Sequence, residues 1–569
     1  MVADRDVEAL VAAVEVLRDE VGAAALPLAL PRREEAETAR VQLLRQLDDY
    51  VLPRLRSLDA PLLAVVGGST GAGKSTLVNS VVGTEVSRAG VLRPTTTAPV
   101  LVHHADDAHW FQGDRILPGL ARVTGRRADG EQPGTVRLVA SDSLPAGLAL
   151  LDAPDIDSVV SANRELATQL LAAADLWLFV TTAARYADAV PWDLLRTAAD
   201  RGTAVAIVLD RIAPEAVDEI RPHLAAMLRD EGLPTAPVFT VAEVGLGPDG
   251  RLPDEAFARL RSWLAALAGD ARARDIVVSQ TLRGAVGSLS GRAEALVAAS
   301  RAQEEAERAL AGAVEESFAT AHRHVADGMT DGSLLRGEVL ARWQEFVGTG
   351  EFFRQVESTI SRWRDRVTAA LKGIPPPPRT LGEALHTGVA ALVVANLEAA
   401  TSDTTRAWRR LPGGPELVAA QPGLARPADG SGERVERMVR DWQGEVLDLV
   451  RTEGQGRRTN ARIAAYGVNA IGLFLMLVAF AHTGGLVGAE VGIAGGTAVL
   501  AQRVLEAVFG DQAVRDMAAK ARHRLLELTD EVYAEEQQRY ADVLDAHRTP
   551  PGQAESLRAA TARLAEVAR

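Results

Sequence analysis

The sequence contains no cysteine, and this absence removes several classes of chemistry at once. A chain without thiols forms no disulfide bonds, binds no zinc through thiolates and uses no cysteine nucleophile. The absence leaves the cellular compartment open. Residues 1–8 lack the basic start and the apolar core of a secretory signal peptide. We therefore expect the functional site to face the cytoplasm.

Lysine is almost as scarce as cysteine. Of 62 basic residues only three are lysines, namely Lys74, Lys372 and Lys520. Arginine is therefore the usual cation of this chain. A lysine retained against that bias indicates a position that needs a compact ammonium group.

Charge and length limit the broad class of protein. The formal net charge is −14, which argues against bulk attraction to nucleic acid, so we predict no nucleic-acid partner. Hydrophobic residues make up 47% of the chain, a share typical of folded proteins. A chain of 569 residues is too long for a single core, and roughly three domains are expected from length alone.

One of the three lysines lies in a phosphate-binding motif. Residues 68–75 read Gly-Ser-Thr-Gly-Ala-Gly-Lys-Ser and match G-x-x-x-x-G-K-[ST]. The motif follows an apolar run at 61–66, typical of a buried strand, and leads into a predicted helix at 75–82. Its glycines let successive backbone N–H groups surround a phosphate, and the helix N-terminus adds partial positive charge. The predicted phosphate-binding residues are Gly68, Ser69, Thr70, Gly71, Ala72, Gly73, Lys74, Ser75 and Thr76.

The loop and two segments after it contain the residue types that bind a nucleoside triphosphate and its Mg²⁺ ion. Lys74 would reach the β- and γ-phosphates, and the Ser75 hydroxyl would ligate Mg²⁺. The polar segment 84–97 contains threonines, and a threonine in a mobile loop after a phosphate-binding loop completes the Mg²⁺ shell. The apolar run at 147–151 ends in Asp152, which is placed to hold Mg²⁺ through water.

The remaining apolar runs predict the fold of this part of the chain. Runs at 176–180, 204–209 and 237–241 alternate with helical patterns. Strands that alternate with helices indicate an α/β domain with a doubly wound, mostly parallel sheet. Ligands of such sheets bind at the carboxyl ends of the strands, where all the motifs above fall.

The order of these motifs resembles the bacterial branch of the dynamin-like GTPases. Residues 65–75 look like the first motif of that family, residues 96–101 resemble its switch I, and residues 152–155 resemble its D-x-P-G. The resemblance spans roughly residues 60–245. It implies a GTPase that uses GTP/GDP and Mg²⁺, with catalytic residues at Thr70, Lys74 and Thr96 and metal ligands at Ser75, Thr96 and Asp152.

The sequence departs from the family pattern at three places. Asp155 stands where the family has glycine, and Thr70 stands where dynamins carry a water-positioning glutamine. The guanine-reading motif [NT]-K-x-D is replaced by residues 210–213, Asp-Arg-Ile-Ala. We still place Asp155, Asp210 and Arg211 in the nucleotide site. These departures leave two alternatives open, namely an ATP-using P-loop enzyme and a nucleotide-gated membrane scaffold with little turnover.

From about residue 272 the pattern is helical, rich in Ala, Leu, Glu and Arg. Long helices are predicted at 276–330, 334–371, 381–410, 433–452 and from 512 onward, with a Pro/Gly-rich loop at 411–432. Antiparallel packing of such helices forms an elongated bundle, a stalk in terms of the resemblance. The predicted domains are an N-terminal helical segment that joins the bundle (1–57), the GTPase domain (58–270), the stalk (271–455), an apolar hairpin (456–510) and C-terminal helices that return to the bundle (511–569).

The apolar hairpin is the candidate membrane contact. Residues 463–481 carry no formal charge, and this segment is just long enough to span a membrane. The second apolar segment, 486–501, is shorter and contains Glu490. Arginines flank the hairpin on both sides, as expected for entry and exit from the cytoplasm. Glycines at 484, 488, 492 and 496 leave one helix face bare, which suits close helix packing in a membrane or in a buried core. A second candidate contact is the aromatic segment 346–353, for which core packing is preferred.

These observations lead to one preferred function. We expect a membrane-associated GTPase at the cytoplasmic face of a bacterial cell membrane. If the apolar hairpin spans the membrane, the protein is embedded in it through residues 463–501. Its partners would be anionic lipid and other GTPase domains, as a homo-oligomer or as a hetero-oligomer with a related dynamin-like protein. The histidines at 103, 104 and 109 are a weak metal candidate, and a solvated loop is preferred there.

Overall fold

The computed structural model describes residues 4–87, 98–113, 115–124, 134–158, 161–330, 379–453, 475–476 and 509–568. The chain forms two compact units. The first unit comprises Met1–Leu26, Arg32–Ala302 and Thr549–Arg569, and the second comprises Pro27–Pro31 and Gln303–Arg548.

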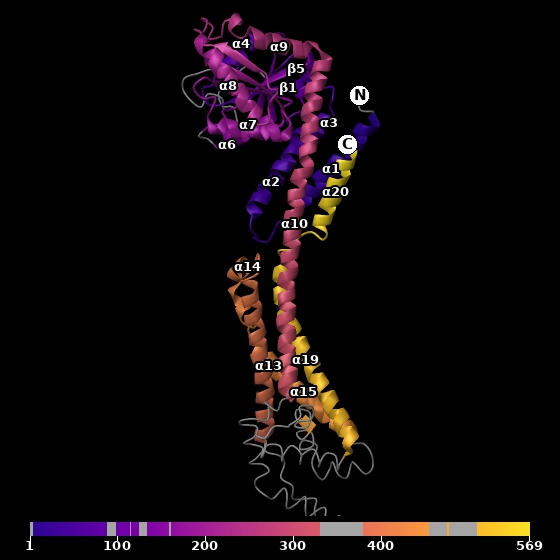
Figure 1. Ribbon diagram of the computed structural model, residues 1–569. Coiled ribbons are helices and arrows are strands. Elements are labelled where there is room, and N and C mark those ends of the chain that lie inside the picture. Colours follow the sequence, from indigo (N-terminus) through magenta and orange to yellow (C-terminus); the bar gives the residue numbers. More distant parts are fainter. Residues whose placement is uncertain are drawn as a thin grey trace, which may run out of the picture. The chain divides into compact units, whose positions relative to one another are not determined.

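The first unit contains an eight-stranded sheet with the strand order β3-β4-β2-β5-β1-β6-β7-β8. Figure 1 labels two of its central strands, β1 and β5. Only the β2–β5 pairing is antiparallel among the described strands, which confirms the mostly parallel sheet expected from the sequence. The strands are β1 (Leu62–Gly68), β2 (Val100–His103), β3 (Ala121–Thr124), β4 (Thr135–Ala140), β5 (Leu148–Asp152), β6 (Leu176–Thr182), β7 (Ala204–Ile212) and β8 (Val238–Ala242).

The central strands are apolar throughout because both faces of the sheet are covered. Every residue of β1, β5 and β6 is buried. Successive residues of β6 enter opposite cores, since Trp177 belongs to one hydrophobic cluster and Leu178 to the other. The flanking helices are α4 (Lys74–Val82), α5 (Ala108–Phe111), α6 (Ser161–Ala172), α7 (Ala189–Arg201), α8 (Val217–Asp230) and α9 (Ala258–Gly269).

Helices from both ends of the chain complete the first unit. Helix α1 (Asp4–Ala23) lies beside α20 (Gln553–Val567), as Figure 1 shows. Both pack with the first part of α10 (Ala271–Thr330) in a cluster that includes Leu17, Leu289 and Leu557. The Gln553 side chain accepts a hydrogen bond from the Ala25 backbone N–H at 2.7 Å and donates to the Ser300 hydroxyl at 2.8 Å. Residues about 530 positions apart in sequence are thus held together in one core.

A buried polar network joins the N-terminal helices to the sheet. Helix α2 (Arg33–Gln46) continues through a π-helical turn (Leu47–Val51) into α3 (Leu52–Leu55). Asp175, just before β6, forms an ion pair with Arg54 at 3.2 Å and accepts a hydrogen bond from the Tyr50 hydroxyl at 3.2 Å. Its second oxygen accepts from the Leu63 backbone N–H at 2.9 Å. Burial raises the pKa of Asp175, and the charge of Arg54 and these hydrogen bonds offset that effect.

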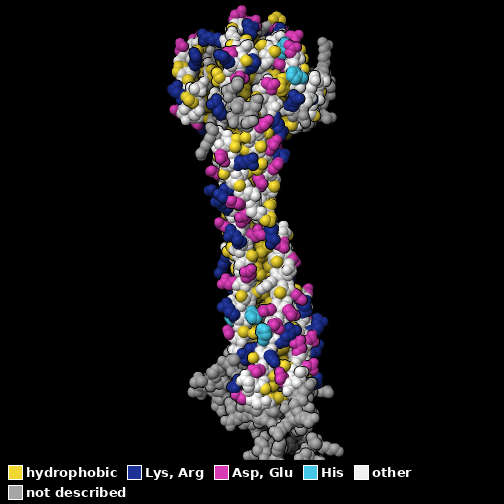
Figure 2. Space-filling view, turned by 90° about the vertical axis from the view of Figure 1, so that its right-hand side faces the viewer, with side chains coloured by type: hydrophobic (Ala, Val, Ile, Leu, Met, Phe, Trp, Pro, Cys, Tyr) yellow, Lys and Arg dark blue, Asp and Glu magenta, His cyan; other side chains and the backbone are white. Residues whose placement is uncertain are grey.

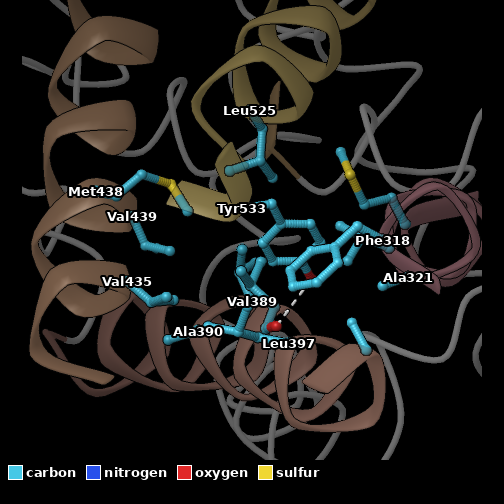
Figure 3. Packing of buried hydrophobic residues seen from close by; sticks show 14 of the residues in the cluster. Phe318, Ala321, Val389, Ala390, Leu397, Val435, Met438, Val439, Leu525 and Tyr533 are labelled. Carbon is cyan, nitrogen blue, oxygen red and sulfur yellow. Dashed lines mark hydrogen bonds between the residues drawn. The ribbon is translucent and has the colours of Figure 1, made fainter. Parts of the chain in front are cut away.

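The second unit is a helical bundle with one core. It contains the remainder of α10, α13 (Arg379–Trp408), α14 (Gly414–Ala420), α15 (Ser431–Glu453) and α19 (Asp511–Asp545). Tyr533 of α19 lies among Phe318, Val389 and Leu397, and its hydroxyl donates to the Val393 carbonyl at 3.0 Å (Figure 3). On the face shown in Figure 2, basic and acidic side chains are interspersed. Arg524 of α19 forms an ion pair with Glu445 of α15 at 2.8 Å.

The bundle differs from the sequence expectation in the segment predicted as a loop, 411–432. This segment contains α14 and a 3-10 turn at Pro422–Ala425. Gly413 caps the start of α14 in a left-handed conformation, and Leu417 and Leu424 are buried.

The strands β3 and β4 of the first unit were not predicted. They are short, and β3 is mostly exposed, so neither has an apolar run of its own.

The two candidate membrane contacts lie largely outside the described residues. The segment 346–353 is wholly outside them, and the hairpin 463–501 is described only at Leu475 and Met476, which are buried in the core of the second unit. One described helix, Gly382–Trp408, is long and apolar enough to cross a membrane. That helix also supplies Val389, Val393 and Leu397 to the bundle core, as a core helix does.

The network around Asp175 generates the first prediction. Asp175→Ala leaves the Arg54 guanidinium buried without its counter-ion, so we expect the first unit to lose about 3–5 kcal/mol of unfolding free energy. Thermal or denaturant unfolding of the full chain measures this loss. The matched control is Asp193→Ala, because Asp193 forms an exposed pair with Arg196 and its removal should cost less than about 1 kcal/mol. Equal effects of the two substitutions would contradict the prediction.

Candidate nucleotide-binding site

The predicted phosphate-binding loop connects β1 to α4, as the motif requires. Gly71 and Gly73 have φ values of 72° and 95°, which favour glycine. At Gly68 a Cβ atom would lie 2.1 Å from the Val180 carbonyl oxygen, so the loop leaves β1 against β6 at a point where only glycine fits. Helix α4 begins at Lys74, and its first backbone N–H groups therefore face the loop.

Lys74 is held inside this loop. Its side chain is 5% exposed, and its ammonium group donates hydrogen bonds to the carbonyls of Gly68 at 2.8 Å and Ser69 at 3.1 Å. The third partner is the Asp155 carboxylate, at 2.5 Å. The residue that departs from the family glycine therefore neutralises the lysine that would bind the phosphates.

Asp152 lies at the end of β5, beside β1 in the sheet. Its Oδ2 accepts hydrogen bonds from the hydroxyls of Ser75 at 2.7 Å and Ser87 at 2.5 Å. Its Oδ1 is buried and has no hydrogen-bond partner among the described residues. Burial raises the pKa of Asp152, and the two hydroxyl hydrogen bonds and the charge of Lys74 oppose that effect. The orphaned carboxylate oxygen and the Ser75 hydroxyl are hard oxygen donors and fit Mg²⁺.

Thr70, at the tip of the loop, is fixed by two residues that the sequence analysis did not identify. Asp157 accepts hydrogen bonds from both the backbone N–H and the hydroxyl of Thr70, each at 2.6 Å. Arg185 donates to the Thr70 carbonyl at 3.0 Å and pairs with Asp157 at 2.9 Å. Burial alone would raise the pKa of Asp157, but the hydrogen bonds from Thr70 and Arg185 lower it. The Thr70 hydroxyl thus has an acceptor in Asp157.

Asp210 and Arg211 approach the same loop from the end of β7. The Arg211 guanidinium donates to the Gly71 carbonyl, and Arg211 has the positive φ of 54°. A Cβ at Gly73 would lie 2.3 Å from the Asp210 Oδ2 atom, so Asp210 adjoins the loop directly. Burial raises the pKa of Asp210 to about 6, partly offset by a hydrogen bond from the Arg211 backbone N–H.

The structure thus brings most of the predicted site residues together. Residues 68–76, Asp152, Asp155, Asp210 and Arg211 all lie at or beside the loop, at the carboxyl edge of the parallel strands. Thr96 lies outside the described residues. Asp157 and Arg185 were missed because neither belongs to a motif, although Asp157 follows Asp155 by two positions. Ser87 lies at the start of the predicted switch segment and carried no signal beyond its hydroxyl.

The histidine-rich segment 103–109 does not form a metal site in the described part of the chain, where no cluster of metal-ligating side chains occurs. His103 is the last residue of β2, is 3% exposed and stacks on Phe111 with ring centroids 5.3 Å apart. The expectation of a solvated loop is therefore wrong for His103, because the strand extends to that residue and turns its ring into the core.

The raised pKa of Asp210 predicts a pH-dependent stability in the absence of nucleotide. The folded-state pKa of about 6 exceeds the ordinary value of 3.8, so the stabilising effect of protonation is present below pH 3.8 and is lost as the pH rises through 6. Asp210→Asn removes this titration. We expect the variant to gain about 2–3 kcal/mol relative to the parent chain between pH 4 and pH 7. Thermal unfolding across that range measures the gain, and a constant difference between the two proteins would refute it.

Part of the sequence that contains this site matches a known protein family. Residues 63–211 match the family model described as the dynamin family. No curated protein matches the sequence. The matched region includes β1, the phosphate-binding loop, Asp152, Asp155 and the pair Asp210–Arg211.

Three solved structures illustrate what the chain is similar to. One is a chain of an oligomerised bacterial dynamin pair described as sensing and tethering membranes over long range, with 10% identity over 93% of this chain and 94% of that chain and a TM-score of 0.40. Toc33 from Arabidopsis thaliana, in complex with Mg²⁺ and GMPPNP, has 14% identity over 43% of this chain and 94% of its own, with a TM-score of 0.24. LeoA, a bacterial dynamin GTPase from ETEC, has 12% identity over 100% of this chain and 99% of its own, with a TM-score of 0.23.

The family match and the site geometry agree on the same residues. The loop, the buried lysine and the serine–aspartate pair lie within the matched region, on a mostly parallel sheet. Residues 63–211 are therefore identified as a dynamin-family GTPase domain.

Proposed function

We propose that this protein is a membrane-associated dynamin-like GTPase that couples GTP binding and hydrolysis to membrane remodelling, fusion or division. One observation carries the nucleotide part of the proposal. The buried Lys74 ammonium and the Ser75–Asp152 pair lie side by side at the start of α4, where a triphosphate and its metal ion are bound in phosphate-binding loops. The family of the domain favours GTP over the ATP alternative.

In this proposal, each residue of the site has a separate role in binding the phosphates, Mg²⁺ or the attacking water. Lys74 would bind the β- and γ-phosphates, and the loop backbone would surround them. Ser75, Thr96 and Asp152 would hold Mg²⁺, which when bound neutralises charge on the phosphates. Thr70 would help to position the attacking water in place of the dynamin glutamine. Asp155 would leave Lys74 when phosphate arrives, because the two anions compete for one ammonium group.

The membrane part of the proposal rests on the apolar hairpin. Residues 463–481 carry no formal charge, and arginines at 457, 458, 462 and 503 flank the apolar segments in the sequence. Arginines in that place would bind anionic headgroups and keep the ends of the hairpin at the cytoplasmic face. The long helices α10, α13, α15 and α19 would connect the hairpin to the nucleotide cycle. Contact between GTPase domains in a homo-oligomer, or with a related dynamin-like protein, completes the proposal.

The contact between Asp155 and Lys74 predicts an effect on nucleotide affinity. Asp155→Gly removes the competing carboxylate, so we expect GDP and GTP to bind about tenfold more tightly, since a charged hydrogen bond contributes about 1.5–3 kcal/mol. Titration with a fluorescent guanine nucleotide measures the change. Asp193→Gly, at an exposed acid of the same domain, is the matched control and should bind as the parent chain does. Weaker binding by Asp155→Gly would show that Asp155 assists the nucleotide instead.

The whole proposal is tested by phosphate release from GTP with Mg²⁺, measured with and without anionic liposomes. We expect turnover that rises on the liposomes and falls at least a hundredfold in Lys74→Ala, because the ammonium group stabilises the transferred phosphoryl group. The control is Lys520→Ala, which removes an exposed lysine of α19. Turnover that ignores liposomes would refute the membrane part alone. Nucleotide binding without turnover on any surface would favour a nucleotide-gated scaffold.

A further inference from the structure

The guanine-reading part of the site lacks its usual acceptor. Guanine carries hydrogen-bond donors at N1 and at the 2-amino group, and adenine lacks both, so a carboxylate facing that edge selects guanine. In the motif [NT]-K-x-D the final aspartate supplies this carboxylate. Here the corresponding residue is Ala213, which has no acceptor on its side chain. A guanine-specific site in this chain therefore needs a carboxylate from another element.

Strand β8 brings such a carboxylate to the same place. Strands β7 and β8 run parallel, and Ile212 pairs with Ala242 after a shift in register. The next residue, Glu243, donates its backbone N–H to the Ile212 carbonyl at 3.1 Å. Glu243 therefore emerges at the carboxyl edge of the sheet, directly beside the Ile212–Ala213 segment in which the motif's aspartate would stand.

The surroundings of Glu243 suit a nucleobase. The Arg211 side chain crosses from the end of β7 to the Gly71 carbonyl, which leaves its alkyl stem as a surface on which a flat ring can stack. The adjoining Asp210 has a buried Oδ1 with no hydrogen-bond partner among the described residues. Val244 and Leu246, which follow Glu243 in the sequence, are 41% and 53% exposed and offer apolar surface close to it.

The charge of Glu243 also acts on the neighbouring Asp210. Its negative charge contributes to raising the pKa of Asp210, so the two carboxylates are near enough to interact. The Glu243 side chain is exposed and has no ion pair within the described part of the chain. An acid kept without a counter-ion beside another acid has unused accepting capacity, and the donor edge of guanine would fill it.

We propose that Glu243 is the specificity-determining residue of the nucleotide site, whose carboxylate accepts hydrogen bonds from N1 and the 2-amino group of guanine in place of the absent motif aspartate. This inference rests on the proposed function, because it assigns the base-reading role within the same GTP site. Another carboxylate, that of Glu215, lies two positions after Ala213 in the sequence, in the 3-10 turn Pro214–Ala216. Glu215 is therefore the alternative acceptor to be tested.

The test exchanges the acceptor for a donor. Glu243→Gln presents an amide N–H, which is matched to the C2 carbonyl of xanthine and mismatched to the 2-amino group of guanine. GDP, XDP and IDP are titrated against the parent chain, Glu243→Gln and the matched control Glu215→Gln, all as full-length protein. We expect Glu243→Gln to bind GDP at least about tenfold more weakly and XDP at least about tenfold more tightly, while the control keeps the parent preference. IDP, which lacks the 2-amino group, should bind the parent chain more weakly than GDP does.

The outcomes separate this inference from the function on which it rests. Parent protein that prefers GDP while Glu243→Gln leaves the preference unchanged overturns the role of Glu243 and leaves the GTPase proposal intact. A switch to XDP in Glu215→Gln instead overturns it in favour of Glu215. Parent protein that binds no guanine nucleotide overturns the proposed function itself, and with it the inference. Since Glu243 is exposed, Glu243→Gln should unfold at the same temperature as the parent chain, which a thermal melt checks.

Discussion

The nucleotide site depends on the burial of one ammonium group. Lys74 is almost inaccessible to water, and such a charge is tolerated only when it is paired and hydrogen-bonded. Two loop carbonyls and the Asp155 carboxylate meet that requirement. The loop can present those carbonyls only because glycines let its backbone turn tightly against β6 and Asp210. The lysine, the glycines and the neighbouring strands are therefore parts of one constraint.

The same constraint explains the anions around the loop. Asp152, Asp155, Asp157 and Asp210 all lie at the carboxyl edge of the sheet, and each contacts or adjoins the loop or the serine that follows Lys74. Buried donors without acceptors are costly, and these carboxylates supply acceptors to the loop and to Lys74. A triphosphate would therefore replace existing hydrogen bonds rather than fill a site with unused donors, which limits net affinity and makes it sensitive to each acid.

Much of the fold and site could be predicted from the sequence because their signals are local. The phosphate-binding loop, the strand that ends in Asp152 and the long helices each occupy one continuous stretch with a clear pattern. The contacts of Asp157 and Arg185 with Thr70 join residues 87 and 115 positions apart, and no pattern within either segment reports them. The Asp175 network was missed for the same reason. In the sequence, an aspartate before a strand is typical of a turn. Only the structure shows that Asp175 forms a buried ion pair with Arg54.

The departures from the family pattern acquire a common meaning in the structure. Asp155 replaces a glycine and pairs with Lys74, while Thr70 replaces a glutamine and is held by Asp157 and Arg185. Each substitution by itself reads as the loss of a functional residue. Together they provide the loop with internal partners for its lysine and for its tip. Under the proposed function, these are the groups that would act on the γ-phosphate, so Asp155 and Asp157 would compete with the phosphate for them. Arrival of a nucleotide would then displace the segment that carries Asp155 and Asp157, which is the property that a switch requires.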